Sequence, residues 1–316
     1  MDFWPSDDER DLQDGIRTFL RGRFPIEVVR EREEDPRGVI DRDRWSELAA
    51  TGVFSVAADI GLRAAALVFE ELGRALVPGP LAATAVAAPW VPGAADGTLI
   101  VSTLETADDP VVVEHPAQVD ALLVASSSSL AVVDPAALVM RVVEMPTDTL
   151  TPVAVVSRPL PPAREVGDGA AAQRFVRNAV VLTAAQQTGV ALGAIELATD
   201  YAKHREQFGR PIGSFQAVKH MLADMLVKAE VARAAVYAAA CAIDGASNDD
   251  PLVAASVAKL MAGEAALFCG KTGIQVHGGM GFTWDVHAQR FWKRAVALDN
   301  SFGITDHHAA VIAATL

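Results

Sequence analysis

The hydrophobic pattern of this 316-residue chain changes twice along its length, and these changes constrain the fold more than any other feature. Residues 1–92 show the three- and four-residue spacing of amphipathic helices. Residues 93–165 instead contain short β-branched runs separated by Asp, Pro, Ser and Gly, which is typical of a small all-β module. Residues 166–316 return to the pattern of long helices, clearly so from Arg174. The sequence therefore predicts a mainly helical α+β protein with three domains at these limits.

Capping signals mark several helix limits. Ser6 and Glu9 have capping-box spacing, so a helix is expected to begin there and to run toward Arg23. Residues 43–50 predict a short helix that Gly52 stops, and residues 63–76 predict an amphipathic one.

The C-terminal part predicts an antiparallel four-helix bundle, because its long helices are joined by short loops. Pro251 follows three polar residues and is expected to open a helix that runs to about Gln275, and a last helix is expected over 305–314. Another helix carries apolar residues at helical spacing on one face: Val218, Met221, Leu222, Met225, Ala229, Ala232 and Val236.

Composition excludes several classes of function. The chain is 51% hydrophobic with net charge −13, which allows a large core and argues against binding nucleic acid or anionic membranes. Cys241 and Cys269 lie in helical patterns, which favours buried thiols in a reducing compartment. No uncharged apolar run has the ~18 residues of a membrane span, and the acidic start is unlike a signal peptide. The histidines and cysteines show no metal-ligand spacing. A cytoplasmic protein without a bound metal is expected.

The segment 205–216 contains a first candidate phosphate contact. A guanidinium such as that of Arg205, near a helix end, can hold a phosphate by two parallel hydrogen bonds. Gly209 is expected to end the helix in a left-handed conformation, and Pro211 prevents its continuation. With Ser214 as N-cap, Gln216 falls in the next helix's first turn, where its amide could meet an adenine or ribose edge. The alternative is a capped helical turn with a solvated arginine.

The segment 275–282, Gln-Val-His-Gly-Gly-Met-Gly-Phe, is a second candidate phosphate contact. Its glycines permit positive φ and close backbone approach, and free N–H groups there can cradle a phosphate. A lone glycine pair is more often a tight turn. Two such motifs on consecutive helices favour phosphate binding.

With these motifs the chain resembles the acyl-CoA dehydrogenase family over nearly its whole length. Residues 70–80 resemble that family's N-terminal domain, and the two motifs match its two FAD signatures, which in the family reach across a dimer interface to the neighbour's FAD. The resemblance implies that Arg205 and the loop 275–279, with Gly278 and Gly279, meet the FAD pyrophosphate. It also implies that Phe208, Gln216 and Gln275 line the path between flavin and adenosine.

The catalytic carboxylate is missing from both positions where the family keeps it. In register, one position is Phe302 and the other, on the first bundle helix, is Ala179. Asp299 is the nearest substitute, although a cap or surface role is the simpler interpretation; Asp285, His307 and His308 are further candidates. The β-domain loop 101–109 also lacks the family's glycines, and no aromatic residue lies between Val91 and Arg174 to stack on a flavin ring.

These departures predict the short, base-lacking subunit of a heteromeric acyl-CoA dehydrogenase. The chain resembles the paired subunits of actinobacterial steroid side-chain degradation, which assemble as α2β2 tetramers, so the implied substrate is a bulky acyl-CoA such as a sterol side-chain thioester. The partner subunit would hold the flavin ring and supply the base. Two alternatives remain: a self-sufficient homo-oligomer with Asp299 or another unusual base, and a scaffold protein that has lost flavin contact.

Overall fold

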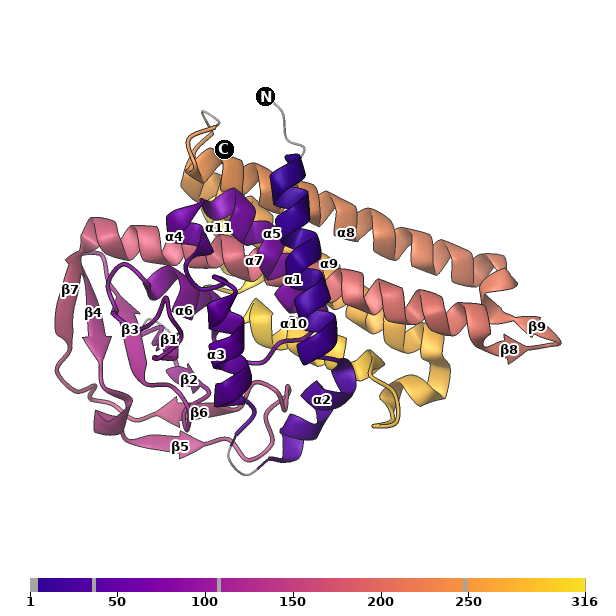
Figure 1. Ribbon diagram of the computed structural model, residues 1–316, viewed down its shortest axis with the longest axis horizontal. Helices are drawn as coiled ribbons and strands as arrows, with labels where there is room; N and C mark the ends of the chain where they lie inside the picture. The colour runs from indigo at the N-terminus through magenta and orange to yellow at the C-terminus, as the bar shows by residue number, and fades with distance from the viewer. Residues whose placement is uncertain (1–4, 36–37, 107–108, 247–248, 316) are drawn as a thin grey trace.

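A computed structural model describes residues 5–35, 38–106, 109–246 and 249–315. The N-terminal part is helical, as predicted (Figure 1). Its helices are α1 (Asp7–Arg23), α2 (Ile26–Glu31), the 3-10 turn η1 (Arg32–Glu34), α3 (Arg42–Ala50), α4 (Val56–Asp59), α5 (Leu62–Arg74) and α6 (Leu81–Ala87). The capping box is confirmed, because the Ser6 hydroxyl accepts the Glu9 N–H and the Glu9 carboxylate accepts the Ser6 N–H.

The middle part consists of two small sheets, which Figure 1 shows at one end of the molecule. One sheet has the order β1-β3-β4-β7, with β1 and β3 parallel, and the other has the order β2-β6-β5. The strands are β1 (Val101–Thr103), β2 (Val112–Glu114), β3 (Ala121–Ala125), β4 (Ser129–Val133), β5 (Met140–Val142), β6 (Val153–Val156) and β7 (Arg164–Asp168), with the turn η2 (Pro135–Ala137). The three-domain division itself stays a prediction, and β7 runs across its 165–166 limit.

The C-terminal part is built on three long helices. It contains α7 (Gly169–His204), β8 (Glu206–Gln207), β9 (Arg210–Pro211), η3 (Ile212–Ser214), α8 (Gln216–Ile243), α9 (Pro251–His277), η4 (Gly278–Phe282), α10 (Ala288–Asp299) and α11 (Thr305–Ala313). Pro251 opens α9, as predicted, and the structure shows Asp250 as its N-cap. The prediction that Ser214 caps α8 is wrong: its hydroxyl donates to the Pro211 carbonyl, and the N-cap is Phe215.

Helix α7 is the centre of the core and packs directly on α5 through glycines. A Cβ added at Gly189 would lie 1.8 Å from the Glu70 carbonyl oxygen, and one at Gly73 would lie 2.0 Å from that of Gln186. The two backbones can therefore approach this closely only without side chains at these positions. This contact fixes the N-terminal helices against the bundle.

Buried ion pairs close the same junction. The Glu70 carboxylate, 3% exposed, accepts two hydrogen bonds of 2.8 Å from Arg233 on α8. The Glu71 carboxylate, 1% exposed, accepts bonds of 2.9 and 2.8 Å from Arg17 on α1. Such paired charges hold α1, α5 and α8 in one arrangement, and removal of one partner would leave a buried charge uncompensated.

Two helical stretches, Gly169–His204 and Pro251–Phe282, are long and apolar enough to cross a membrane by length and composition alone. Their most apolar windows are 83% and 50% buried inside the chain, respectively. Core helices of a bundle have this character, since they are hydrophobic on most sides. Cys241 and Cys269 are free and buried in this bundle, as predicted.

Candidate functional site

The hairpin β8–β9 presents an aromatic side chain to solvent. Gln207 pairs with Arg210, so Phe208 and Gly209 form a two-residue turn, and their φ values of 55° and 75° are those of a type I′ turn. Phe208 is 91% exposed and meets the Phe215 ring edge-on at 6.1 Å. The prediction that Gly209 ends the preceding helix is wrong, because α7 ends at His204 and the positive φ of Gly209 serves the hairpin instead.

Arg205 directly follows α7, and its backbone is fixed on both sides. Its N–H donates to the Tyr201 carbonyl at 2.8 Å, and its carbonyl accepts the Ile212 N–H at 2.8 Å. Its side chain is exposed, and within the described part of the chain no carboxylate pairs with it. The guanidinium is therefore free to bind an external anion, while its root is held in place.

The loop 275–279 is similarly open. Gln275 is exposed on the last turn of α9, and Gly278 ends that helix with φ 62°. A Cβ added at Gly278 or Gly279 would meet no atom within 4 Å, and the φ of Gly279 lies outside the left-handed region. Nothing in the described chain therefore requires glycine at 279, whereas close approach by an external group would require it.

The fold brings the two motifs together at one end of the bundle. The rings of Tyr201, in the last turn of α7, and His277, the last residue of α9, stack at 4.2 Å and 25°. Arg205 and Gly278 each follow closely in sequence, and Gln216 is exposed at the start of α8. Figure 1 shows the β8–β9 hairpin at this end, far from the two sheets.

The two positions at which the resemblance places the family's base, Phe302 and Ala179, are both buried. Phe302 is 7% exposed, and its ring meets Phe175 edge-on at 6.0 Å. Ala179, fully buried, lies one turn after Phe175 on α7, and the Trp90 ring meets Phe175 edge-on at 6.4 Å. The Trp90–Phe175–Phe302 series thus occupies the region that both expected base positions border, and neither position itself carries a carboxylate.

The backbone of the loop that carries Phe302 is held from three directions. Lys259 on α9 donates to the carbonyls of Leu298, Asp299 and Gly303, each at 3.1 Å. The Phe302 N–H donates to Glu105 at 2.7 Å, and its carbonyl accepts from His308 Nε2 at 3.0 Å. Burial lowers the pKa of Lys259 to about 8. Phe302 itself has φ 58°, which is strained for a residue with a Cβ.

The residues considered as substitute bases lie in different environments. Asp299, the last residue of α10, accepts a 2.7 Å hydrogen bond at its Oδ1 from the Thr305 hydroxyl. Asp285 and His307 are exposed at the surface. His308 is buried between Ser256 and the Phe302 carbonyl, and burial lowers its pKa to about 4. None of these contacts directs a base toward Phe175.

A buried polar cluster links the β-domain to this loop, and the sequence patterns did not reveal it. The Ser301 hydroxyl donates to Glu114 at 2.7 Å, and burial raises the pKa of that carboxyl. Arg294 on α10 pairs with Asp148 at 2.6 Å, and both are buried. Burial also lowers the pKa of the neighbouring His115 to about 3. Only the fold brings these segments together, so no local signal could have identified them.

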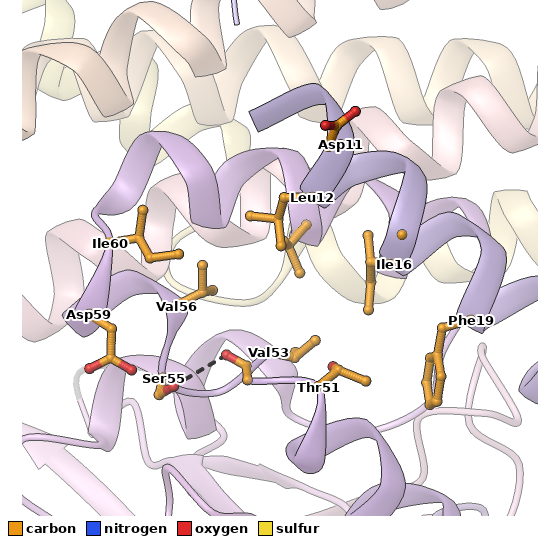
Figure 2. Close-up of a pocket in the computed structure, with 13 residues that line it drawn as sticks. Asp11, Leu12, Ile16, Phe19, Thr51, Val53, Ser55, Val56, Asp59 and Ile60 are labelled. Carbon is orange, nitrogen blue, oxygen red and sulfur yellow. Dashed lines mark hydrogen bonds between the residues drawn. The ribbon is translucent and has the colours of Figure 1, made fainter. Parts of the chain in front are cut away.

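A pocket lies elsewhere, on the N-terminal helices (Figure 2). This open groove of about 460 Å³ lies between α1 and the segment 51–60, and Figure 2 shows Leu12, Ile16 and Phe19 facing Val53 and Val56. Its charged lining residues are acidic, so it offers no cation to a phosphate. In the described ranges, no group of three His, Cys, Asp or Glu could hold a metal ion.

Comparisons with known proteins identify the family and the fold of the chain. The profile described as "Acyl-CoA dehydrogenase, C-terminal domain" matches residues 167–316. The chain is 31% identical to acyl-CoA dehydrogenase IpdE2 of Mycobacterium tuberculosis, over 92% of each chain. Among solved structures, a variant of the Tcur3481-Tcur3483 steroid ACAD has TM-score 0.82 at 27% identity over 97% of both chains. A chain of the ChsE4-ChsE5 complex from Mycobacterium tuberculosis has TM-score 0.84 at 22% identity, covering 99% of this chain and 98% of that one, which shows the fold.

The fold and these relatives define a flavin-dependent oxidoreductase that acts on acyl-CoA thioesters. The chain belongs to the acyl-CoA dehydrogenase family. The cofactor of this family is FAD, and the resemblance first recognised from the two motifs is confirmed.

The residues fit FAD at one end only. Arg205, exposed and unpaired in the described chain, and the open glycines at 278 and 279 suit the phosphate end. The side that would face a flavin of the chain's own has no aromatic residue between Val91 and Arg174, and its base position is a buried phenylalanine. Within the loop 101–109, Ala107 and Asp108 lie outside the described residues.

Proposed function

We propose that this chain is the base-lacking subunit of a heteromeric acyl-CoA dehydrogenase. The reaction requires a carboxylate to remove the α-proton of the thioester, with FAD as hydride acceptor. A partner subunit holds the flavin ring and supplies that carboxylate. This chain supplies Arg205, Phe208, Gln216, Gln275 and the glycines 278 and 279 from across the interface.

The observation that carries this proposal is the contrast between the two sides of the chain. The residues expected to face a neighbour's cofactor are exposed, as Arg205 and the glycine pair show. The residues expected to face the chain's own substrate are replaced and closed off, because Phe302 packs on Phe175. A self-sufficient enzyme needs a base at its own substrate site in addition to residues that contact a neighbour's cofactor.

The assembly is an α2β2 tetramer that works in the cytoplasm on a bulky acyl-CoA such as a steroid side-chain thioester. The names of two similar structures support this extension: one is a steroid ACAD named after two components, and the other is a complex of ChsE4 with ChsE5. The competing possibility is a homo-oligomer that uses Asp299, whose carboxylate accepts a hydrogen bond from Thr305 rather than facing Phe175.

The test is the visible spectrum of the chain purified alone and after co-expression with an acyl-CoA dehydrogenase chain encoded beside it. The proposal predicts a colourless protein alone and a yellow complex with one FAD per pair. Arg205→Ala in that complex is expected to weaken FAD binding at least tenfold, because a charge-assisted bidentate contact is lost. Arg141→Ala, which removes an exposed arginine of β5, is the matched control. A full complement of FAD in the chain alone would overturn the proposal.

A further inference from the structure

The stack of Tyr201 on His277 is the contact that joins the two cofactor-facing segments. Tyr201 lies four residues before Arg205, and His277 directly precedes Gly278. The ring centroids are 4.2 Å apart and the planes differ by 25°. The stack therefore connects the root of the arginine to the root of the glycine loop.

The two rings lie at the ends of two different helices. His277 is 5% exposed, and its Nδ1 donates to the Gly273 carbonyl at 2.7 Å, which sets the orientation of the imidazole. Tyr201 belongs to the last turn of α7, and its carbonyl accepts the Arg205 N–H at 2.8 Å. The stack thus joins two side chains whose backbones directly neighbour the two cofactor-facing segments.

The segments on either side of the stack are largely open to solvent. Phe208, Gly278 and Gly279 are exposed, and a Cβ at either glycine would touch nothing. Among the described contacts, the stack is the ring interaction that spans the ends of α7 and α9. Local order in such an open region depends on the few buried contacts that it has.

We propose that Tyr201 and His277 are positioning residues that hold the Arg205 side of the site at a fixed distance from the loop 275–279, so that both contact one FAD pyrophosphate. This inference rests on the proposed function. A phosphate held by two separate segments is bound tightly only if the segments are already at the correct separation, because ordering them on binding lowers the affinity.

The experiment measures the FAD dissociation constant of the co-expressed complex carrying Tyr201→Ala, His277→Ala or both. Each single variant is expected to weaken FAD binding about tenfold, equivalent to about 1.4 kcal/mol. The double variant should lose little more, since either change abolishes the same stack. His277→Phe, which keeps an aromatic ring, should remain within about threefold of the wild type, and His307→Ala removes an exposed histidine as a control.

The outcomes separate this inference from the proposed function. If Arg205→Ala weakens FAD binding but the Tyr201 and His277 variants stay within twofold of the wild type, the stack is packing only and the inference is wrong. If Arg205→Ala also has no effect, the cofactor does not reach this end, and the proposed function falls together with the inference. If His277→Ala does not assemble, the Tyr201→Ala and His277→Phe complexes still test the inference. Equal FAD affinity of these two complexes would refute a positioning role for the stack.

Discussion

Replacement of Phe302 tests whether the family base position has become a structural contact. Phe302 is only 7% exposed, and its ring packs edge-on against Phe175. Truncation of a buried phenylalanine to alanine typically costs about 3–5 kcal/mol, of which an aromatic pair contributes about 0.5–1.5 kcal/mol. Phe302→Ala is therefore expected to lower the free energy of unfolding by roughly 3 kcal/mol or more.

The backbone conformation at this position predicts a second, independent difference in the free energy of unfolding. Phe302 has φ 58°, which alanine tolerates no better than phenylalanine but glycine adopts freely. Phe302→Gly should therefore be about 1 kcal/mol more stable than Phe302→Ala, although it removes more atoms. The neighbouring Ile304 is 46% exposed, so Ile304→Ala should cost less than about 1 kcal/mol and serves as the control.

The assay is urea unfolding followed by circular dichroism, with the midpoint and slope compared across the variants. A loss below about 1 kcal/mol for Phe302→Ala, similar to that of Ile304→Ala, would refute the reasoning that this ring fills the interior. Phe302→Glu adds a functional arm. Burial at this position would raise the pKa of the new carboxyl, and no dehydrogenase activity is expected from the chain alone.

Three further outcomes follow from individual contacts. Gly281→Ala should destabilise the chain, because its Cβ would lie 2.5 Å from the Ile274 carbonyl oxygen, whereas Gly279→Ala should leave the unfolding midpoint unchanged and weaken only FAD binding by the complex. Gly189→Ala should prevent normal packing of α7 on α5 and yield little folded protein, measured as soluble yield and thermal midpoint. The folded pKa of His308, about 4, lies below its ordinary 6.5, so its contribution to stability is complete above pH 6.5 and declines as pH falls toward 4. Between these pH values the free energy of unfolding should change by up to about 1.4 kcal/mol per pH unit because of this group. This dependence should be weaker in His308→Gln.

The sequence predicted those features that depend on neighbours in the chain. The Ser6–Glu9 capping box and the start of α9 at Pro251 were readable because these signals lie within a few residues of the helices that they begin. Strand β7, Arg164–Asp168, was missed because it lacks the run of β-branched residues that marked the other strands. Its pairing with β4, rather than its own composition, makes it a strand.

The candidate site divides in the same way. The motifs around Arg205 and Gly278 were identified from local residue types, but the Tyr201–His277 stack that joins them depends on how two helices end side by side. The Arg294–Asp148 pair likewise joins residues far apart in sequence, and a buried ion pair has no signature in one segment. Gly209 was assigned the wrong turn because a glycine signals positive φ without saying whether a helix end or a hairpin uses it.

The strained and exposed conformation of Phe208 also favours an external partner at the β8–β9 hairpin. A phenylalanine with φ 55° at a hairpin tip costs on the order of 1 kcal/mol relative to glycine, and a ring that is 91% exposed recovers little of this by burial. The edge contact with Phe215 at 6.1 Å is its one described ring contact. Burial of that ring against a partner would contribute about 1.5–3 kcal/mol, enough to offset the strain. Phe208→Gly should therefore stabilise the isolated chain slightly while weakening the complex, and a variant that weakens neither assembly nor FAD binding would argue against an interface at this hairpin.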